Sequence, residues 1–388
     1  MTVHRTPGVY LEHVVPPPQP VLLTGVPVFL GYADEATVEE HEVLGVPQRL
    51  TLWPQFEERF GPPPRKGGYL GPAVRGFFEN GGSLCYVVAL QDGDAPLDEL
   101  IDGLAAVADL DAADLVCAPD VMRGADPNEE PDPDRFAPLQ QAILDDCRTT
   151  GGRFAILDAV LTSEKETVKT QRGKLTGDDG ALYHPWLRIT DLAGKPAHVP
   201  PCGHVAGAYA RSDQRVGVHK APANEVIEGA LDVRVDLDPA MVAELYERGV
   251  NCLRALPGRG IRVWGARTLS DDAAWPHVGG RRVLLTVGRW LERFMTGLAH
   301  EPNDVRLWVR ISREVAAYLD GLFARGALEG RAPEEAFFVK CDGETNPPEV
   351  RAAGQVVTQV GLALAAPAEF VVVRVIAGAS GVSVSPAP

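Results

Sequence analysis

The first half of the chain alternates the patterns of buried strands and amphipathic helices, and this alternation constrains the fold more than any other feature. Apolar runs at 84–90, 115–118 and 153–158 are typical of strands buried on both faces. Between them, apolar residues recur at helical spacing within 97–107 and 136–147. A strand–helix–strand–helix–strand series predicts a parallel sheet with right-handed crossovers.

The second half contains two helices with recognisable starts. Asp238 and Pro239 form a capping residue followed by proline in the first turn, and Gly249 ends that helix. A second helix opens at Asn303 and Asp304. Its apolar face consists of Leu307, Ile311, Val315, Tyr318 and Leu322.

Two strand patterns follow these helices. Residues 356–362 alternate apolar and polar side chains, and residues 370–376 form a last β-rich run before a tail of small residues at 377–388. The predicted fold class is therefore α/β with a mainly parallel sheet, mixed with α+β character towards the end of the chain.

The N-terminal segment differs from the rest. Residues 9–15 are β-branched and aromatic, and the proline-rich residues 16–20 stiffen the chain directly after them. A frayed terminus is one interpretation. We favour the other, a strand that pairs elsewhere, because the spacer hinders folding back onto a neighbouring strand.

Length and charge exclude several classes of protein. The 388 residues suit two or three packed modules. The 37 basic and 53 acidic residues give a net charge of −16, which disfavours a nucleic-acid partner. There is no apolar run long enough to span a bilayer, and residues 1–15 lack the pattern of a signal peptide, so we expect folding in the cytoplasm without membrane insertion.

The reactive residue types form no recognisable catalytic or metal-binding motif. A phosphate-binding loop is missing, since Gly173 and Lys174 are followed by Leu175. Gly258 and Gly260 fit a tight turn better than a phosphate cradle. Neighbouring side chains that could supply a nucleophile and a base are Cys202, His204, Asp213 and His219, and possible metal ligands are His184, His198, His204 and His219. Their spacing fits neither chemistry, so we expect no catalytic site, no metal and no cofactor.

The six cysteines lie far apart and mostly within apolar runs. They are Cys85, Cys117, Cys147, Cys202, Cys252 and Cys341. The absence of a C-x-x-C pair argues against zinc and disulfides, and we expect buried free thiols.

An ordered series of phrases in the second half resembles the contractile tail sheath protein family. The phrases lie at 199–213, 217–225, 249–251, 257–268, 301–304, 307–308, 336–339 and 367–370, and residues 7–10 match the usual start of the family. Cys202 stands where the family more often has serine, which weakens a functional role for its thiol. The region 27–200 matches loosely, as an outer domain that varies would.

The resemblance implies a division of the chain into four parts. These are a strand-exchange arm at 1–26, a variable outer α/β domain at 27–198, a conserved sheath core at 199–365, and a C-terminal strand and tail at 366–388. It also implies a structural subunit without enzymatic activity. Such subunits polymerise as stacked hexameric rings around an inner tube, and they contract to drive the tube through a target envelope.

The implied partners are other copies of the chain, the inner tube protein, and baseplate and terminator or cap proteins. Assembly is expected in the cytoplasm, as part of a phage-tail-like particle that is released or acts at the cell envelope. A phage tail, a tailocin and an extracellular injection system stay open, and the length of the chain favours the last. Two other classes also stay open, namely a cytoplasmic α/β enzyme and a different shell-forming protein.

Two sets of residues are candidates for assembly contacts. Strand exchange between subunits is expected to involve Val9, Tyr10, Leu11, Val14, Val356, Val360, Phe370, Val372 and Arg374. Contact with an acidic inner tube is expected from two arginine stripes, Arg306, Arg310 and Arg313, and Arg282, Arg289 and Arg293. The alternative for the stripes is a solvated helix face.

Overall fold

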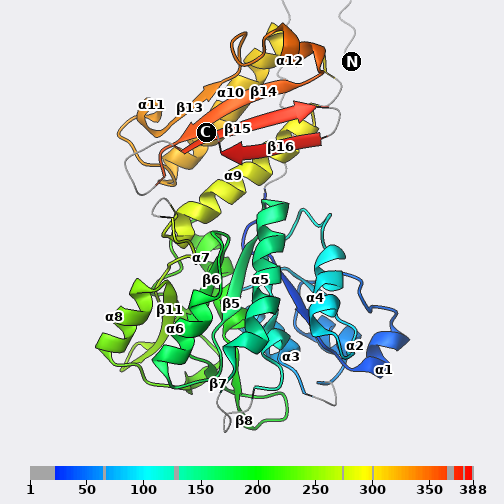
Figure 1. Cartoon of the computed structure of the whole chain (residues 1–388), viewed down its shortest axis with the longest axis vertical. Coiled ribbons are helices and arrows are strands. Elements are labelled where there is room, and N and C mark those ends of the chain that lie inside the picture. The colour runs from blue at the N-terminus through cyan, green and yellow to red at the C-terminus, as the bar shows by residue number, and fades with distance from the viewer. Residues whose placement is uncertain are drawn as a thin grey trace, which may run out of the picture.

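The chain forms two bodies joined by one long helix, α9 (Val278–Thr296), as Figure 1 shows. The computed structural model describes residues 22–63, 67–125, 131–272, 275–298, 301–364, 371–378 and 381–386. The larger body is built on a nine-stranded sheet and the smaller one on a four-stranded sheet.

The nine-stranded sheet has the order β2-β3-β1-β4-β5-β6-β11-β12-β9. Its strands are β1 (Pro27–Gly31), β2 (Gln48–Leu50), β3 (Cys85–Ala89), β4 (Leu115–Cys117), β5 (Phe154–Asp158), β6 (Gly180–His184), β9 (Val226–Ile227), β11 (Val250–Leu256) and β12 (Gly260–Trp264). The consecutive strands from β3 to β11 run parallel, and β2, β12 and β9 are antiparallel at the edges. All of β1 and β5 is buried, because helices cover both faces of the sheet.

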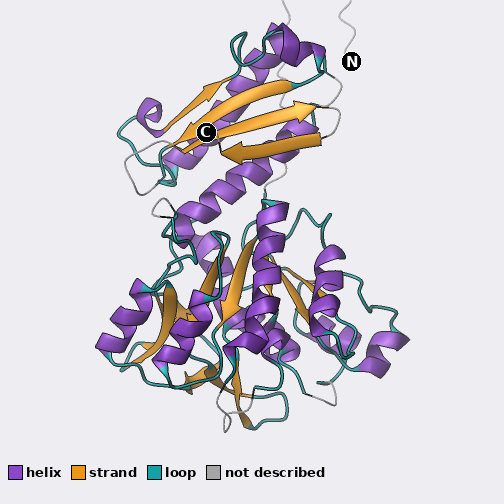
Figure 2. Cartoon of the chain, in the orientation of Figure 1, coloured by secondary structure: helices purple, strands orange, loops and turns teal. Residues whose placement is uncertain are grey.

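Helices divide between the two faces of this sheet (Figure 2). One face packs against α1 (Glu35–Glu40), α2 (Pro54–Phe60), α3 (Leu70–Glu79) and α7 (Cys202–Arg215). The other packs against α4 (Pro96–Ala105), α5 (Pro133–Thr150), α6 (Lys165–Gly173) and α8 (Pro239–Glu247). In β1, Phe29 faces the core that includes α3 and α7, while Val28 and Leu30 face the core that includes α4 and α5. Successive side chains of a strand alternate in this way between the two faces of a sheet.

Helices α3 and α7 approach one another so closely that only glycine fits between them. A Cβ atom on Gly203 would lie 2.2 Å from the carbonyl oxygen of Ala73, and one on Gly207 would lie 2.5 Å from that of Phe77. The four-residue spacing places both glycines on one face of α7. The two glycines that follow Cys202 therefore allow the backbones of α3 and α7 to lie in direct contact.

Two smaller features complete the larger body. A three-stranded antiparallel sheet has the order β10-β7-β8, with strands β7 (Leu187–Thr190), β8 (Pro196–Val199) and β10 (Ala230–Val233). A short 3₁₀ helix, η1 (Pro119–Met122), follows β4. The turn between β11 and β12 has φ values of 68° at Gly258 and 72° at Gly260, so the prediction of a tight turn there is confirmed.

The smaller body packs a four-stranded antiparallel sheet against helices. Its sheet has the order β13-β14-β15-β16, with strands β13 (Phe337–Lys340), β14 (Val356–Leu362), β15 (Val371–Gly378) and β16 (Gly381–Pro386). Its helices are α10 (Val305–Ala324), α11 (Pro333–Ala336) and α12 (Pro348–Ala352), and α9 shares its core. The stacked rings of Trp290 and Tyr318, 3.9 Å apart, join α9 to α10.

Most expectations about the elements are confirmed. The parallel sheet is present, with β3, β4 and β5 at the three predicted runs and α4 and α5 between them. Asp238 accepts a hydrogen bond from the Met241 amide, and Gly249 follows the helix with a φ of 78°. Asp304, the second of the two expected residues, caps α10.

Two features of the structure add to the sequence expectations. Within the small-residue tail, 381–386 form β16, whose valines alternate with exposed serines. The division at residue 198 does not divide the large sheet, since β9, β11 and β12 from the second part continue it. An outer domain at 27–198 and a core at 199–365 therefore stand as a proposal about which surfaces vary among relatives.

Candidate functional site

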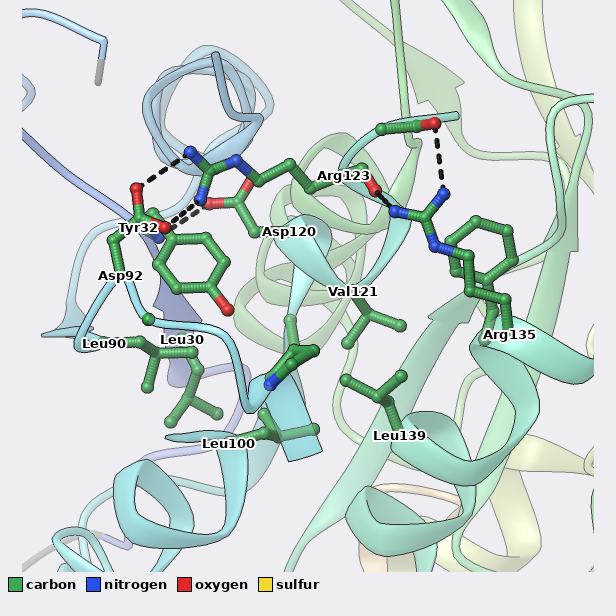
Figure 3. Close-up of a pocket in the computed structure, with 15 residues that line it drawn as sticks. Leu30, Tyr32, Leu90, Asp92, Leu100, Asp120, Val121, Arg123, Arg135 and Leu139 are labelled. Atoms are coloured by element: carbon green, nitrogen blue, oxygen red, sulfur yellow. Dashed lines mark hydrogen bonds and ion pairs between the residues drawn. The ribbon is translucent and has the colours of Figure 1, made fainter. Parts of the chain in front are cut away.

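The carboxyl ends of β1, β3 and β4 enclose a crevice of about 360 Å³ (Figure 3). Strand β1 lies between β3 and β4, so the loops that leave β1 and β4 diverge at this point. Open α/β sheets bind their ligands at such a position. The crevice is therefore where an active site would be expected first.

Two charged side chains of the crevice, Asp92 and Arg123, form an ion pair. Nη1 and Nη2 of Arg123 each lie 3.0 Å from a carboxylate oxygen of Asp92, and the guanidinium stacks 4.5 Å from the ring centre of Tyr32 (Figure 3). The Tyr32 hydroxyl donates to Glu99 at 2.7 Å. Burial and the Glu99 carboxylate raise the pKa of Tyr32, so the phenol stays protonated.

Asp120 connects the loops beneath this pair. Its carboxylate accepts the amide of Tyr32 at 2.7 Å and the amide of Tyr69. Burial raises the pKa of Asp120 to about 6, against the lowering effect of these hydrogen bonds. A Cβ on Gly31 would lie 2.5 Å from the carboxylate. These groups hold the ends of β1 and α3 together, and no nucleophile–base pair is formed.

The residues considered for a nucleophile and base are separated in the fold. Cys202 is buried, its amide donates to Asp158 at 2.8 Å, and burial raises the pKa of its thiol. Asp213 pairs with an arginine, and the His204 ring packs against Gly76. Burial lowers the pKa of His204 to about 4, so it is neutral at physiological pH.

The metal and disulfide expectations can be examined for the part of the chain that the structure describes. Within it, no group of three or more His, Cys, Asp or Glu side chains is placed to hold a metal ion. All six cysteines are buried free thiols, as the sequence predicted. None of the helices in these ranges combines the length and apolar character that a membrane crossing needs.

The candidate strand-exchange residues that can be placed lie in the four-stranded sheet. Val356 and Val360 are buried in β14, while Val372 and Arg374 lie in β15, where Arg374 is exposed. Val9, Tyr10, Leu11, Val14 and Phe370 lie outside the described residues.

The pairing within this sheet limits where a further strand can add. Strand β14 pairs with β13 on one side and with β15 on the other over seven residue pairs. Within the described ranges, the outer strands are β13, with four residues, and β16, with six. An additional strand can therefore reach β14 only by displacing one of its partners.

The arginine stripe on α10 is exposed. Arg306, Arg310 and Arg313 project from one side of the helix, where Val305 and Val309 are 63% and 60% exposed. Arg310 and Arg313 make single ion pairs of 2.5 and 2.7 Å with Glu301 and Glu314. The two valines were missed by the sequence analysis, although their four-residue spacing was visible.

The arginine stripe expected on α9 does not form an exposed surface. Arg282 is 2% exposed and Arg289 is 9% exposed, and only Arg293 faces solvent. The expectation that this stripe grips a tube is therefore wrong for Arg282 and Arg289. The alternation of apolar and basic residues on α9 reflects two buried sides, because the helix packs between the two bodies.

Arg282 is the centre of a buried ion cluster. Its guanidinium donates two hydrogen bonds to Asp213, at 3.0 and 2.6 Å, and one to Asp114 at 3.0 Å. It also lies 5.0 Å from the ring centre of Tyr209. Burial opposes its charge, but Asp213 and Asp114 overcome this effect and raise the pKa of Arg282.

Asp114 links this cluster to the beginning of β1. Its carboxylate accepts the amides of Gly25 at 3.1 Å and Val26 at 2.7 Å. The exit of the N-terminal segment, the end of α7 and helix α9 thus meet at one buried group of charges. Sequence analysis missed this cluster, since its members are separated by 69 and 168 positions.

Comparisons with known proteins agree in pointing to one family. The profile of the phage tail sheath protein central domain matches residues 141–269. The tail sheath protein of Salmonella phage ViI is 26% identical over 211 residues, which are 51% of this chain and 32% of that protein. The chain thus matches only about a third of this curated relative.

Solved structures match over nearly the whole chain. A chain of the anti-feeding prophage baseplate has a TM-score of 0.75 and 29% identity, covering 95% of this chain and 98% of that one. A chain of an extracellular contractile injection system, the PVC sheath complex in its contracted state, has a TM-score of 0.72 and 29% identity, with 96% and 97% covered.

Over nearly its whole length the chain has the fold of chains from contractile injection systems. It belongs to the contractile tail sheath protein family.

Proposed function

We propose that this chain is the sheath subunit of an extracellular contractile injection system. It polymerises as stacked hexameric rings around an inner tube, and the polymer shortens to drive the tube through a target envelope. The supporting observation is the match of almost the entire chain, at 29% identity, to a contracted sheath of such a system. Baseplate and terminator proteins bind the two ends of the polymer, and assembly takes place in the cytoplasm.

The work of contraction comes from a difference between two packings of the same subunits. The sequence contains no nucleotide-binding loop, so stored assembly energy must drive the change. A few kcal/mol per subunit, summed over a long polymer, makes the change effectively irreversible.

Residues 9–15 of one copy add a strand to the four-stranded sheet of a neighbour. Because β14 is flanked on both sides, we assign the contact to the outer edge of β16, which offers six residues against four in β13. The hydrogen bonds gained, about 1 kcal/mol each, nearly balance the ordering of the backbone at about 1–2 kcal/mol per residue. A single arm is therefore weak, and the lattice of arms is strong.

Deleting residues 1–15 tests this assignment. The variant should remain a folded monomer and lose polymerisation, as seen by negative-stain microscopy without ATP. The double variant Val9→Ser with Leu11→Ser should behave in the same way, because it removes burial and keeps the backbone. Its control, Glu12→Gln, changes a residue of the same segment that is not among the strand-exchange candidates and should still form tubes. Tubes of normal length from the deletion variant would disprove strand addition by this arm.

The exposed side of α10 contacts the inner tube. Arg306, Arg310 and Arg313 supply a positive surface in a protein of net charge −16, and Val305 and Val309 supply apolar contact area. Contacts of this kind are sensitive to salt and release readily, which suits a tube that must slide.

Reversing the three α10 arginines to glutamate tests the tube contact. The sheath should still polymerise, but the inner tube should be missing from it. A matched control reverses Arg148, Arg188 and Arg234, which are exposed on the larger body. Filled sheaths from the α10 variant would assign the tube contact to another surface.

A further inference from the structure

A small polar cavity lies where the two bodies meet. It has a volume of about 190 Å³, and its wall combines the loops around Leu110 and Gly152 with the side of α9 that carries Arg289 and Arg293. Leu22, the first described residue, also borders it. The cavity is separate from the crevice of the large sheet and from the α10 surface.

Two buried arginines in the wall of this cavity each have one nitrogen atom without a hydrogen-bond acceptor among the described residues. Arg153 is 2% exposed, and its Nη2 donates to backbone carbonyls that include Ala108 at 3.2 Å. Its Nη1 has no hydrogen bond and lies 3.6 Å from the carboxylate of Asp146. Arg289 is 9% exposed, its Nη2 donates to the Asp111 carbonyl at 2.6 Å, and its Nη1 has no acceptor among the described residues.

Two guanidinium nitrogen atoms in this desolvated place therefore lack hydrogen-bond acceptors among the described residues, although Arg153 lies within ion-pair distance of Asp146. A buried cation needs both a counter-charge and hydrogen-bond acceptors, and an unpaired one is strongly destabilising. Burial lowers the pKa of Arg289 on balance, although Asp114 and Asp111 oppose this effect and the guanidinium of Arg153 adds to it. The stem of Arg289 packs against Gly152, where a Cβ would lie 2.8 Å from Cγ, so the side chain is held in position.

The remaining groups of the cavity tolerate an anion. Glu292 and Asp111 supply the acidic side chains in its wall, against Arg153, Arg289 and Arg293. Burial and Asp111 raise the pKa of Glu292, so this carboxyl takes up a proton more readily than an isolated one. The cavity exceeds the volume of a few water molecules, which is enough for a small oxyanion.

We propose that this cavity is an oxyanion site, in which Arg289, Arg153 and Arg293 bind a phosphate-like or carboxylate anion. The ligand supplies the acceptors that the two Nη1 atoms lack, and it bridges α9 to the larger body. The bound anion is either a free inorganic oxyanion or the carboxylate of an acidic side chain from a neighbouring copy. Anion binding goes beyond the proposed sheath function and does not depend on it, since the three arginines belong to one subunit; only the identification of its source rests on polymerisation.

Thermal unfolding of the full-length monomer tests the site. Replacing chloride by about 20 mM inorganic phosphate at equal ionic strength should raise the Tm of the natural chain by about 2–5 °C. Arg289→Gln should abolish this rise, and Arg293→Gln, at the exposed rim, should reduce it. Arg234→Gln, which removes an exposed arginine elsewhere, should keep the full rise.

Two results would overturn the proposal. One is a natural chain whose Tm is the same in phosphate and chloride, and the other is an undiminished rise in Arg289→Gln. Polymerisation in phosphate then identifies the source. If a neighbouring copy supplies the carboxylate, phosphate should slow polymerisation of the natural chain but not of the Arg289→Gln variant. If the ligand is a free anion, phosphate should slow polymerisation of neither protein.

Discussion

The ion cluster at the joint between the bodies allows a quantitative test. Replacing Arg282 by methionine keeps most of the side-chain volume and removes three hydrogen bonds to two carboxylates. Asp114 retains the amides of Gly25 and Val26, but Asp213 loses both of its bonds to the arginine. Removing one partner of a buried ion pair costs about 3–5 kcal/mol, so we expect a loss of this size in the free energy of unfolding near neutral pH.

The same cluster predicts how this loss depends on pH. Burial raises the pKa of Asp213, and Arg282 lowers it, so removing the arginine must raise it further. A carboxyl with a raised folded-state pKa binds its proton more tightly in the folded state, so the penalty shrinks as the pH falls. Asp213→Asn in the Arg282→Met background should restore much of the lost stability at neutral pH, because no buried charge remains unpaired on α7.

Urea unfolding followed by tryptophan fluorescence and by circular dichroism measures these effects. Arg313→Met is the matched control, because its side chain is 71% exposed and its loss should change stability by less than about 0.5 kcal/mol. The reasoning is refuted if Arg282→Met is as mild as this control, or if Asp213→Asn restores nothing.

Two further predictions concern the larger body. Burial raises the pKa of Asp158 to about 7, so the folded state becomes less stable as the pH rises from about 4 to 7 and this carboxyl loses its proton. Asp158→Asn should therefore be more stable than the natural chain by up to about 4 kcal/mol near pH 8. In urea titrations this difference in the free energy of unfolding should disappear towards pH 4. Equal gaps at both pH values would contradict this. Gly203→Ala should destabilise the fold by about 2–4 kcal/mol, because its Cβ would lie 2.2 Å from a backbone oxygen of α3. Gly173→Ala in α6, which has open space around it, should be neutral or stabilising. Similar Tm values for the two variants would argue against the close contact between α3 and α7.

The sequence allowed the larger sheet to be predicted because its strands are locally distinctive. The runs at 84–90, 115–118 and 153–158 are almost wholly apolar, and a strand buried on both faces must be. The cap at Asp238 and the turn at Gly258 are equally local, since they depend on a few consecutive residues. By contrast, β16 combines two valines with glycine, serine and proline, and this short segment becomes a strand because β15 pairs with it and the smaller body covers the valines.

For the candidate sites, too, local features could be predicted from the sequence and features that depend on distant residues could not. The exposure of Arg306, Arg310 and Arg313 followed from the apolar face of their own helix. The burial of Arg282 could not be predicted, because its acidic partners, Asp114 just before β4 and Asp213 in α7, are distant in sequence. A buried arginine and a solvated one have the same helical spacing, and only the second body packed on α9 distinguishes them.

The position of β1 determines how the molecule withstands load. This strand is at the interior of the nine-stranded sheet, with β3 and β4 running parallel on either side, and residues 22–26 lead into its first residue. A pull along this entry acts parallel to the strand, so the ladders on both sides are strained together rather than opened one bond at a time. Before the strand can slide, the amides of Gly25 and Val26 must also leave the Asp114 carboxylate, which is itself anchored by Arg282. A subunit held by its proposed N-terminal arm would thus be loaded in shear within the large sheet, and we expect its rupture force to exceed that of a strand peeled from an edge.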